Sequence, residues 1–115
     1  MLRWWRALSC SKAGFLWAAR NERAFQEELV ALCFAVPMSF WISDAPWKRS
    51  ALIASVLLVI LVETLNSAIE KLADHVSPKR NNAIKIVKDL GSLAVLIAIA
   101  IAGLFWIPAI LSLIA

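Results

Sequence analysis

Three long stretches of the chain are almost entirely apolar, at residues 29–42, 51–62 and 90–115. Only the last reaches the roughly 20 residues that a membrane-spanning helix needs. The first stretch extends back to residue 24, and the second continues to residue 73, when apolar positions at helical spacing are included. The pattern therefore predicts three membrane-spanning helices, at residues 24–42, 49–73 and 89–114.

The first 20 residues are too polar to span a membrane, but they carry large apolar side chains. On a helical wheel five of these fall within about 120° of one another: Trp4, Trp5, Leu8, Phe15 and Leu16. Arg3 and Arg6 lie on the opposite side, whereas Lys12 falls within the apolar arc and Trp17 falls outside it. We expect residues 1–20 to form an amphipathic helix that lies in the cytosolic membrane interface.

Composition favours a membrane protein over a soluble domain. Of the 115 residues, 62% are hydrophobic and 17% are charged, and the mean hydropathy is +0.77. Soluble domains are about 45–50% apolar and about 25% charged, and a soluble domain this small could not bury so much apolar surface. We therefore expect residues 1–115 to form a single all-α membrane domain.

Lysine and arginine are distributed unevenly around the predicted spans. Five precede the first span, two lie between the first and second, and five precede the third. By the positive-inside rule, the N-terminus and the second loop face the cytosol, and the first loop faces outward. The net charge of +4 then reflects topology and contact with anionic lipids. We expect no nucleic acid partner.

A polar stripe follows the second span. At 100° per residue its side chains fall within an arc of roughly 100°: Glu63, Asn66, Ser67, Glu70 and Asp74. A carboxylate at membrane depth costs at least about 2.5–3.5 kcal/mol, so it must face protein, water or an ion. Hydrogen bonding of Asn66 and Ser67 to a neighbouring helix is one interpretation. A stripe of five polar residues near the cytosolic interface favours a functional site.

Charged clusters at the same membrane level suggest what chemistry this site performs. Acids and bases precede the first span at residues 20–28 and the third at residues 85–89. Mg²⁺ takes one or two carboxylates and completes its shell with water and phosphate oxygens, while lysine and arginine neutralise phosphoryl charge. With three glycines and one histidine, the sequence lacks a Walker A motif, a zinc site and a Ser/His pair.

These residues form motifs that strongly resemble the bacterial integral-membrane diacylglycerol kinases: NERAF at residues 21–25, ETLNSAIE at residues 63–70 and KDLGSLAVLIA at residues 88–98. The resemblance covers nearly the whole chain after residue 20. It implies a small three-span homotrimer that transfers the γ-phosphate of MgATP to diacylglycerol and forms phosphatidic acid. It also implies a bacterial inner membrane location, with the active site on the cytosolic side.

The same resemblance implies roles for individual residues. Glu63 matches the proposed catalytic base, Asn66 helps to order that site, and Glu22 and Glu70 match metal-binding carboxylates. Contacts to the nucleotide are implied at Arg3, Glu22, Glu70, Lys88 and Asp89. Contacts to the lipid substrate are implied at Arg3, Glu28, Trp41, Arg49, Glu63 and Ser92.

The chain departs from the better-known members of that family at two places. Cys10 stands where they carry an aromatic residue beside the adenine, and the loop at residues 79–82 lacks their aromatic and histidine residues. We place Cys10, Lys79 and Arg80 at the nucleotide. Anchoring to lipid head groups is the alternative role for the two cations.

The sequence leaves two other functions as alternatives. A sister kinase acting on undecaprenol would use the same polar stripe, because apolar walls select the acceptor, although Gly91 and Ser92 resemble the diacylglycerol branch more closely. A small proton-coupled exporter would also contain an intramembrane glutamate. Such exporters resemble four-span dimers with a single functional glutamate. The sequence of this chain instead predicts three spans and a stripe of five polar residues.

Overall fold

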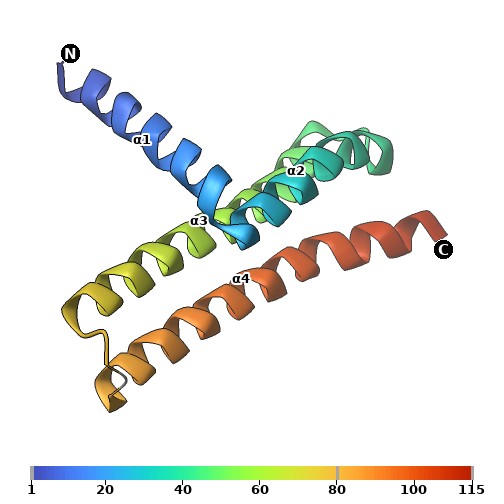
Figure 1. Ribbon diagram of the computed structural model, residues 1–115. Coiled ribbons are helices and arrows are strands. Elements are labelled where there is room, and N and C mark those ends of the chain that lie inside the picture. Colours follow the sequence, from blue (N-terminus) through green and yellow to red (C-terminus); the bar gives the residue numbers. More distant parts are fainter. Residues whose placement is uncertain (1, 80, 115) are drawn as a thin grey trace.

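The computed structural model describes residues 2–79 and 81–114, which form four α-helices and no strand (Figure 1). α1 spans Leu2–Asn21, α2 spans Arg23–Ile42, α3 spans Pro46–Val76 and α4 spans Asn82–Ile114. Three of them, α2, α3 and α4, are long and apolar enough to cross a membrane. These observations confirm the all-helical class and the three candidate spans. Arg80 lies outside the described residues.

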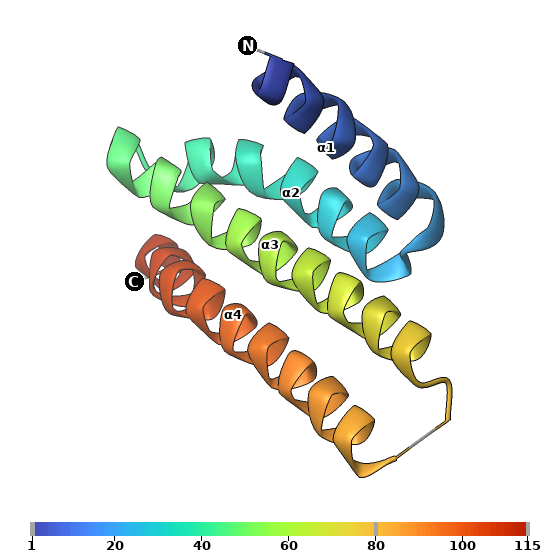
Figure 2. The same ribbon diagram turned by 90° about the vertical axis from the view of Figure 1, so that its left-hand side faces the viewer.

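α3 is the central helix of an antiparallel set of three. It packs against α2 on one side and against α4 on the other (Figure 2). α1 contacts α2, buries none of its residues and projects away from the other helices (Figure 1). The position of α1 in a membrane interface stays a prediction.

The turn between α2 and α3 is held by local contacts. Pro46 occupies the first turn of α3, where a backbone N–H would have no intrahelical partner. The Nε of Arg49 donates a hydrogen bond to the carbonyl oxygen of Ser43 at 2.7 Å, and its guanidinium lies 4.5 Å from the ring centroid of Phe40. Backbone and side chain together therefore fix the predicted turn.

The third apolar helix begins earlier than its predicted span. α4 starts at Asn82 instead of residue 89. The Oδ1 of Asn81 accepts a hydrogen bond from the backbone N–H of Ile84 at 2.9 Å, as in an N-cap. Lys85 and Asp89 then pair one turn apart at 2.8 Å. The polar residues before the third span are therefore helical because they cap and pair with one another.

Small and polar side chains make the contact between α3 and α4. Asn66 is 8% exposed and packs on Gly91, where an added Cβ would collide with the Asn66 side chain. Trp106 Nε1 donates to the carbonyl oxygen of Leu52 and to Ser55 Oγ, each at 3.1 Å. Membrane helices associate through close approach at small residues and through such hydrogen bonds, because lipid tails are as apolar as the helices themselves.

Candidate active site

Glu22 forms the bend between α1 and α2. Its backbone is extended, with φ −109° and ψ 110°, so the helix is interrupted for this residue. An edge-to-face contact between Phe15 and Phe25, with ring centroids 5.5 Å apart, closes the bend. Gln26 Nε2 also donates a hydrogen bond across it to the carbonyl oxygen of Ala19 at 2.8 Å. The Glu22 carboxylate is thereby brought against α3.

Glu22 and Glu63 line the same cavity, of about 240 Å³, between α1, α2 and α3. Its remaining polar lining comes from α3, as Thr64, Ser67 and Lys71. Its apolar lining comes from all three helices, as Gly14, Trp17, Ala18, Phe25 and Ala68. Apolar walls with a few polar groups are typical of a site for a small ligand.

Of the carboxylates of the predicted site, Glu22 and Glu63 line this cavity, and Glu28 and Glu70 lie near Glu63. Within the described part of the chain, three buried oxygens accept no hydrogen bond: Glu22 Oε1, Glu28 Oε1 and Asn66 Oδ1. Carboxylate and amide oxygens are donors that Mg²⁺ prefers, although Glu22 Oε1 also lies 3.0 Å from Lys71 Nζ. Two carboxylates suffice for Mg²⁺ when water and phosphate oxygens complete its shell. Within the described residues, no group of three or more His, Cys, Asp or Glu side chains could hold a metal ion by itself.

The polar stripe on α3 faces two neighbours instead of one. Glu63 and Ser67 line the cavity toward α1 and α2. Asn66 packs on α4, and its Nδ2 donates to Glu70 Oε1 at 3.3 Å. Asp74 pairs with Lys88 of α4 at 2.8 Å. The polar stripe is about 100° wide and lies on the central helix. Some of its side chains therefore face α1 and α2, and others face α4.

The predicted nucleotide residues of α4 share one end of the bundle. Lys88 pairs with Asp74 of α3, and Asp89 pairs with Lys85, each at 2.8 Å. A cavity of about 330 Å³ there is lined by Asn81, Asn82, Ile84, Lys85, Lys88 and Asp89. Lys79 is exposed in the adjoining turn. The structure therefore places cations and a carboxylate together where α3 passes into α4.

The remaining predicted site residues are not gathered at either cavity. They lie on α1, at the turn between α2 and α3, and on α4: Arg3, Cys10, Trp41, Arg49 and Ser92. Trp41 and Arg49 belong to the end of the bundle opposite the turn between α3 and α4 (Figure 1). A single subunit therefore does not bring them to Glu63.

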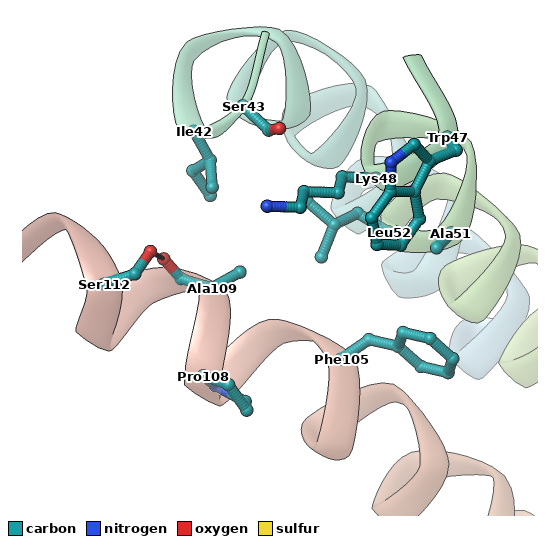
Figure 3. Close-up of a pocket in the computed structure, with 10 residues that line it drawn as sticks. All are labelled: Ile42, Ser43, Trp47, Lys48, Ala51, Leu52, Phe105, Pro108, Ala109 and Ser112. Atoms are coloured by element: carbon teal, nitrogen blue, oxygen red, sulfur yellow. Dashed lines mark hydrogen bonds between the residues drawn. The ribbon is translucent and has the colours of Figure 1, made fainter. Parts of the chain in front are cut away.

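Another cavity, of about 310 Å³, lies at the turn between α2 and α3 (Figure 3). Lys48 directs its ammonium group into it, and Phe105 and Pro108 of α4 form the opposite wall (Figure 3). Its described lining residues include no carboxylate. It thus lacks the groups that the predicted chemistry needs.

Sequence reasoning missed Lys71 and Gly91 as parts of the site. Lys71 lies one turn beyond Ser67 on the cavity side of α3, and that spacing was available from the sequence. Gly91 provides the space that Asn66 occupies. No sequence signal identified this contact, because it joins two helices far apart along the chain.

A bundle with three candidate membrane spans, carboxylates at one cavity and lysines at another has the charged groups that an enzyme embedded in a membrane needs. The family model for prokaryotic diacylglycerol kinase matches residues 9–110, and the chain belongs to that family. It is therefore a bacterial membrane enzyme of this kinase family.

Curated relatives from several bacteria bear the name diacylglycerol kinase. The chain is 42% identical over 99 residues to that of Escherichia coli strain K12, covering 82% of this chain and 81% of the relative. It is 38% identical over 100 residues to that of Pseudomonas aeruginosa, covering 87% and 81%. It is 36% identical over 96 residues to that of Haemophilus influenzae, covering 84% and 81%.

Proposed function

We propose that the protein transfers the γ-phosphoryl group of ATP to the primary hydroxyl of diacylglycerol, at the cytosolic face of the bacterial inner membrane. The names of the relatives support the reaction. The observation that carries it is the cavity in which Glu63 lies among apolar walls beside other carboxylates. An amphipathic alcohol can enter such a site from the membrane while a nucleotide approaches from water.

Glu63 is the proposed general base. As the acceptor oxygen forms its bond to the γ-phosphorus, the bond from that phosphorus to ADP breaks, and ADP leaves with the electron pair. The hydroxyl proton passes to the Glu63 carboxylate, and the products are ADP and phosphatidic acid. Positioning and charge stabilisation contribute more to phosphoryl transfer than the strength of a base, so Glu63 acts mainly by orienting the hydroxyl.

Glu22 and Glu70 are the proposed ligands of Mg²⁺. When bound, the ion neutralises charge on the transferring phosphoryl group. Asn66 keeps Glu70 in place through its hydrogen bond, and its own Oδ1 is an unpaired oxygen among the described residues. The proposed nucleotide contacts are Arg3, Cys10, Lys79, Arg80, Lys88 and Asp89.

We propose that the active enzyme is a homotrimer. Large apolar side chains are exposed along the described helices, including Leu93 at 50% and Leu104 at 75% on α4. Partner helices or lipid must cover them. Subunits of such a trimer share one orientation in the membrane, so Trp41 and Arg49 of each subunit stay at the end of the bundle opposite Glu63 and would contact lipid there. Ser92 adjoins Gly91, which packs on Asn66, so it would contact the lipid substrate nearer the site.

A phosphorylation assay in mixed micelles tests this function. The purified protein is supplied with γ-labelled ATP and either diacylglycerol or undecaprenol. Replacement Glu63→Gln should lower the rate about 10²–10⁴-fold, because it removes the proton acceptor and its charge. Glu27→Gln is the matched control, because Glu27 pairs with Arg23 at an exposed position of α2.

Each outcome of the assay is decisive. Unchanged activity of Glu63→Gln overturns the assignment of the base. Phosphorylation of undecaprenol alone supports the sister activity, and phosphorylation of neither lipid supports transport.

A further inference from the structure

Lys71 contributes the positive charge at the carboxylate cavity. Among the described residues that line this cavity, it is the sole cation. Its Nζ lies 3.0 Å from Glu22 Oε1 and 4.7 Å from the ring centroid of Trp17. The ammonium group therefore joins α3 to α1 and to the bend between α1 and α2.

The contact between Lys71 and Glu22 is an ion pair without the alignment of a hydrogen bond. Glu22 Oε1 is buried, and it accepts no hydrogen bond from the part of the chain that the structure describes. The side chain of Lys71 is 54% exposed, whereas that of Glu22 is 23% exposed. The Lys71 ammonium group can therefore leave the ion pair and be hydrated, but the Glu22 carboxylate cannot. When Lys71 leaves, Glu22 Oε1 needs another cation.

We propose that Lys71 is a positioning residue that holds Glu22 in the metal-free enzyme and competes with a divalent cation for its carboxylate. The inference rests on the proposed function in one respect, the role of Glu22 as a ligand of the metal. An ammonium group and a divalent cation repel each other at one carboxylate oxygen. The long side chain of Lys71 swings away when metal binds, and the face of Trp17 keeps the ammonium group at the cavity.

Binding of Mn²⁺ to the purified full-length protein, without nucleotide or lipid, tests this competition. Replacement Lys71→Met should tighten Mn²⁺ binding about three- to tenfold, as measured by electron paramagnetic resonance. Lys71→Arg should restore nearly the original affinity, because it restores the charge. Lys48→Met is the matched control, because it removes one positive charge at the opposite end of the bundle.

Three further measurements separate this role from a general structural one. Trp17→Leu should tighten Mn²⁺ binding less than Lys71→Met, because it removes only the ring that retains the ammonium group. Adding Glu22→Gln to Lys71→Met should abolish the gain. In the kinase assay, Lys71→Met should lower the Mg²⁺ concentration for half-maximal rate at least twofold. The value of kcat should change by a smaller factor.

The outcomes distinguish this inference from the proposed function. Equal or weaker Mn²⁺ binding by Lys71→Met overturns the competition, even if the protein phosphorylates lipid normally. Tighter binding that depends on Glu22 supports it, even if no lipid is phosphorylated. If Lys71→Met does not fold, Mn²⁺ binding by Trp17→Leu is the test: tighter binding supports the competition, and equal or weaker binding overturns it.

Discussion

The two ends of the helix bundle contain similar residue types but use them differently. At the turn between α2 and α3, Arg49 donates to the Ser43 carbonyl, approaches Asp44 at 3.7 Å and lies over Phe40. Nearby, Trp106 Nε1 is shared between two acceptors on α3. Polar groups at this end are matched to partners in the same subunit and stabilise the fold.

At the other end, ion pairs such as Lys88 with Asp74 at 2.8 Å lie near buried oxygens that accept no hydrogen bond. The oxygens of Glu22, Glu28 and Asn66 are buried and accept no hydrogen bond from the described residues. Glu22 Oε1 has the ion pair with Lys71, whereas no ion pair is found for the other two within the described part of the chain. A buried polar atom without a partner costs about 1–3 kcal/mol, so an arrangement that retains such atoms needs another reason. The contrast is that, among the described residues, buried oxygens that accept no hydrogen bond occur at the end with the proposed site.

The largest effect in this comparison is expected for Glu70→Gln. Glutamine retains an oxygen that can accept the Asn66 hydrogen bond, at 3.3 Å in the native protein, but it removes the charge. The Mg²⁺ concentration for half-maximal activity should rise about 10- to 100-fold, because a neutral oxygen binds a hard cation more weakly. A titration of Mg²⁺ at saturating ATP measures this. An unchanged Mg²⁺ requirement would remove Glu70 from the metal site.

A smaller effect, on stability as well as activity, is expected for Gly91→Ala. The added Cβ collides with the side chain of Asn66, so α3 and α4 must separate or Asn66 must move. The free energy of unfolding should fall by about 1–3 kcal/mol, and activity should fall because Asn66 no longer supports Glu70. Unfolding in mixed detergent measures the first effect and the lipid assay the second.

Gly103→Ala is the control on the same helix. Its Cβ would meet Ile107 Cδ1 at 3.6 Å, which is ordinary van der Waals contact. The helix should gain about 0.5–1 kcal/mol, because alanine has less backbone freedom to lose than glycine. Equal responses at Gly91 and Gly103 would contradict the tight contact with Asn66.

The sequence predicted the helices because their periods and lengths are local properties. The three apolar stretches specified which segments become spans. The predicted span began at residue 89, and the helix that contains it, α4, begins at Asn82. Asn81 caps the segment before residue 89 and Lys85 pairs with Asp89, so it is helical.

The candidate site was only partly predictable. Glu63 and Glu70 could be chosen from the cost of a charge at membrane depth, whereas the roles of Glu22 and Glu28 came from the family resemblance. The structure places these four glutamates near one another. The pairing of Lys71 with Glu22 depends on how α1 bends back onto α3. Such contacts between distant segments follow from tertiary packing, which no local pattern contains.

The smallest expected effect is at the end of the bundle that contains the turn between α2 and α3. Replacement Trp106→Phe removes the Nε1 donor shared by Leu52 and Ser55 but keeps an aromatic ring in the interface. Hydrogen bonds between membrane helices contribute about 0.6 kcal/mol on average. Unfolding should therefore become easier by about that amount, measured in the same detergent series, while kcat and the Mg²⁺ requirement stay unchanged.

Trp47→Phe is the matched control for Trp106→Phe, because Trp47 lies at the same end of the bundle and is 70% exposed. Its replacement should leave the free energy of unfolding unchanged. A change in Mg²⁺ requirement for Trp106→Phe would contradict the separation between the two ends. It would show that the contact between α3 and α4 transmits changes from the turn to the carboxylates, since Asn66 packs on the same pair of helices.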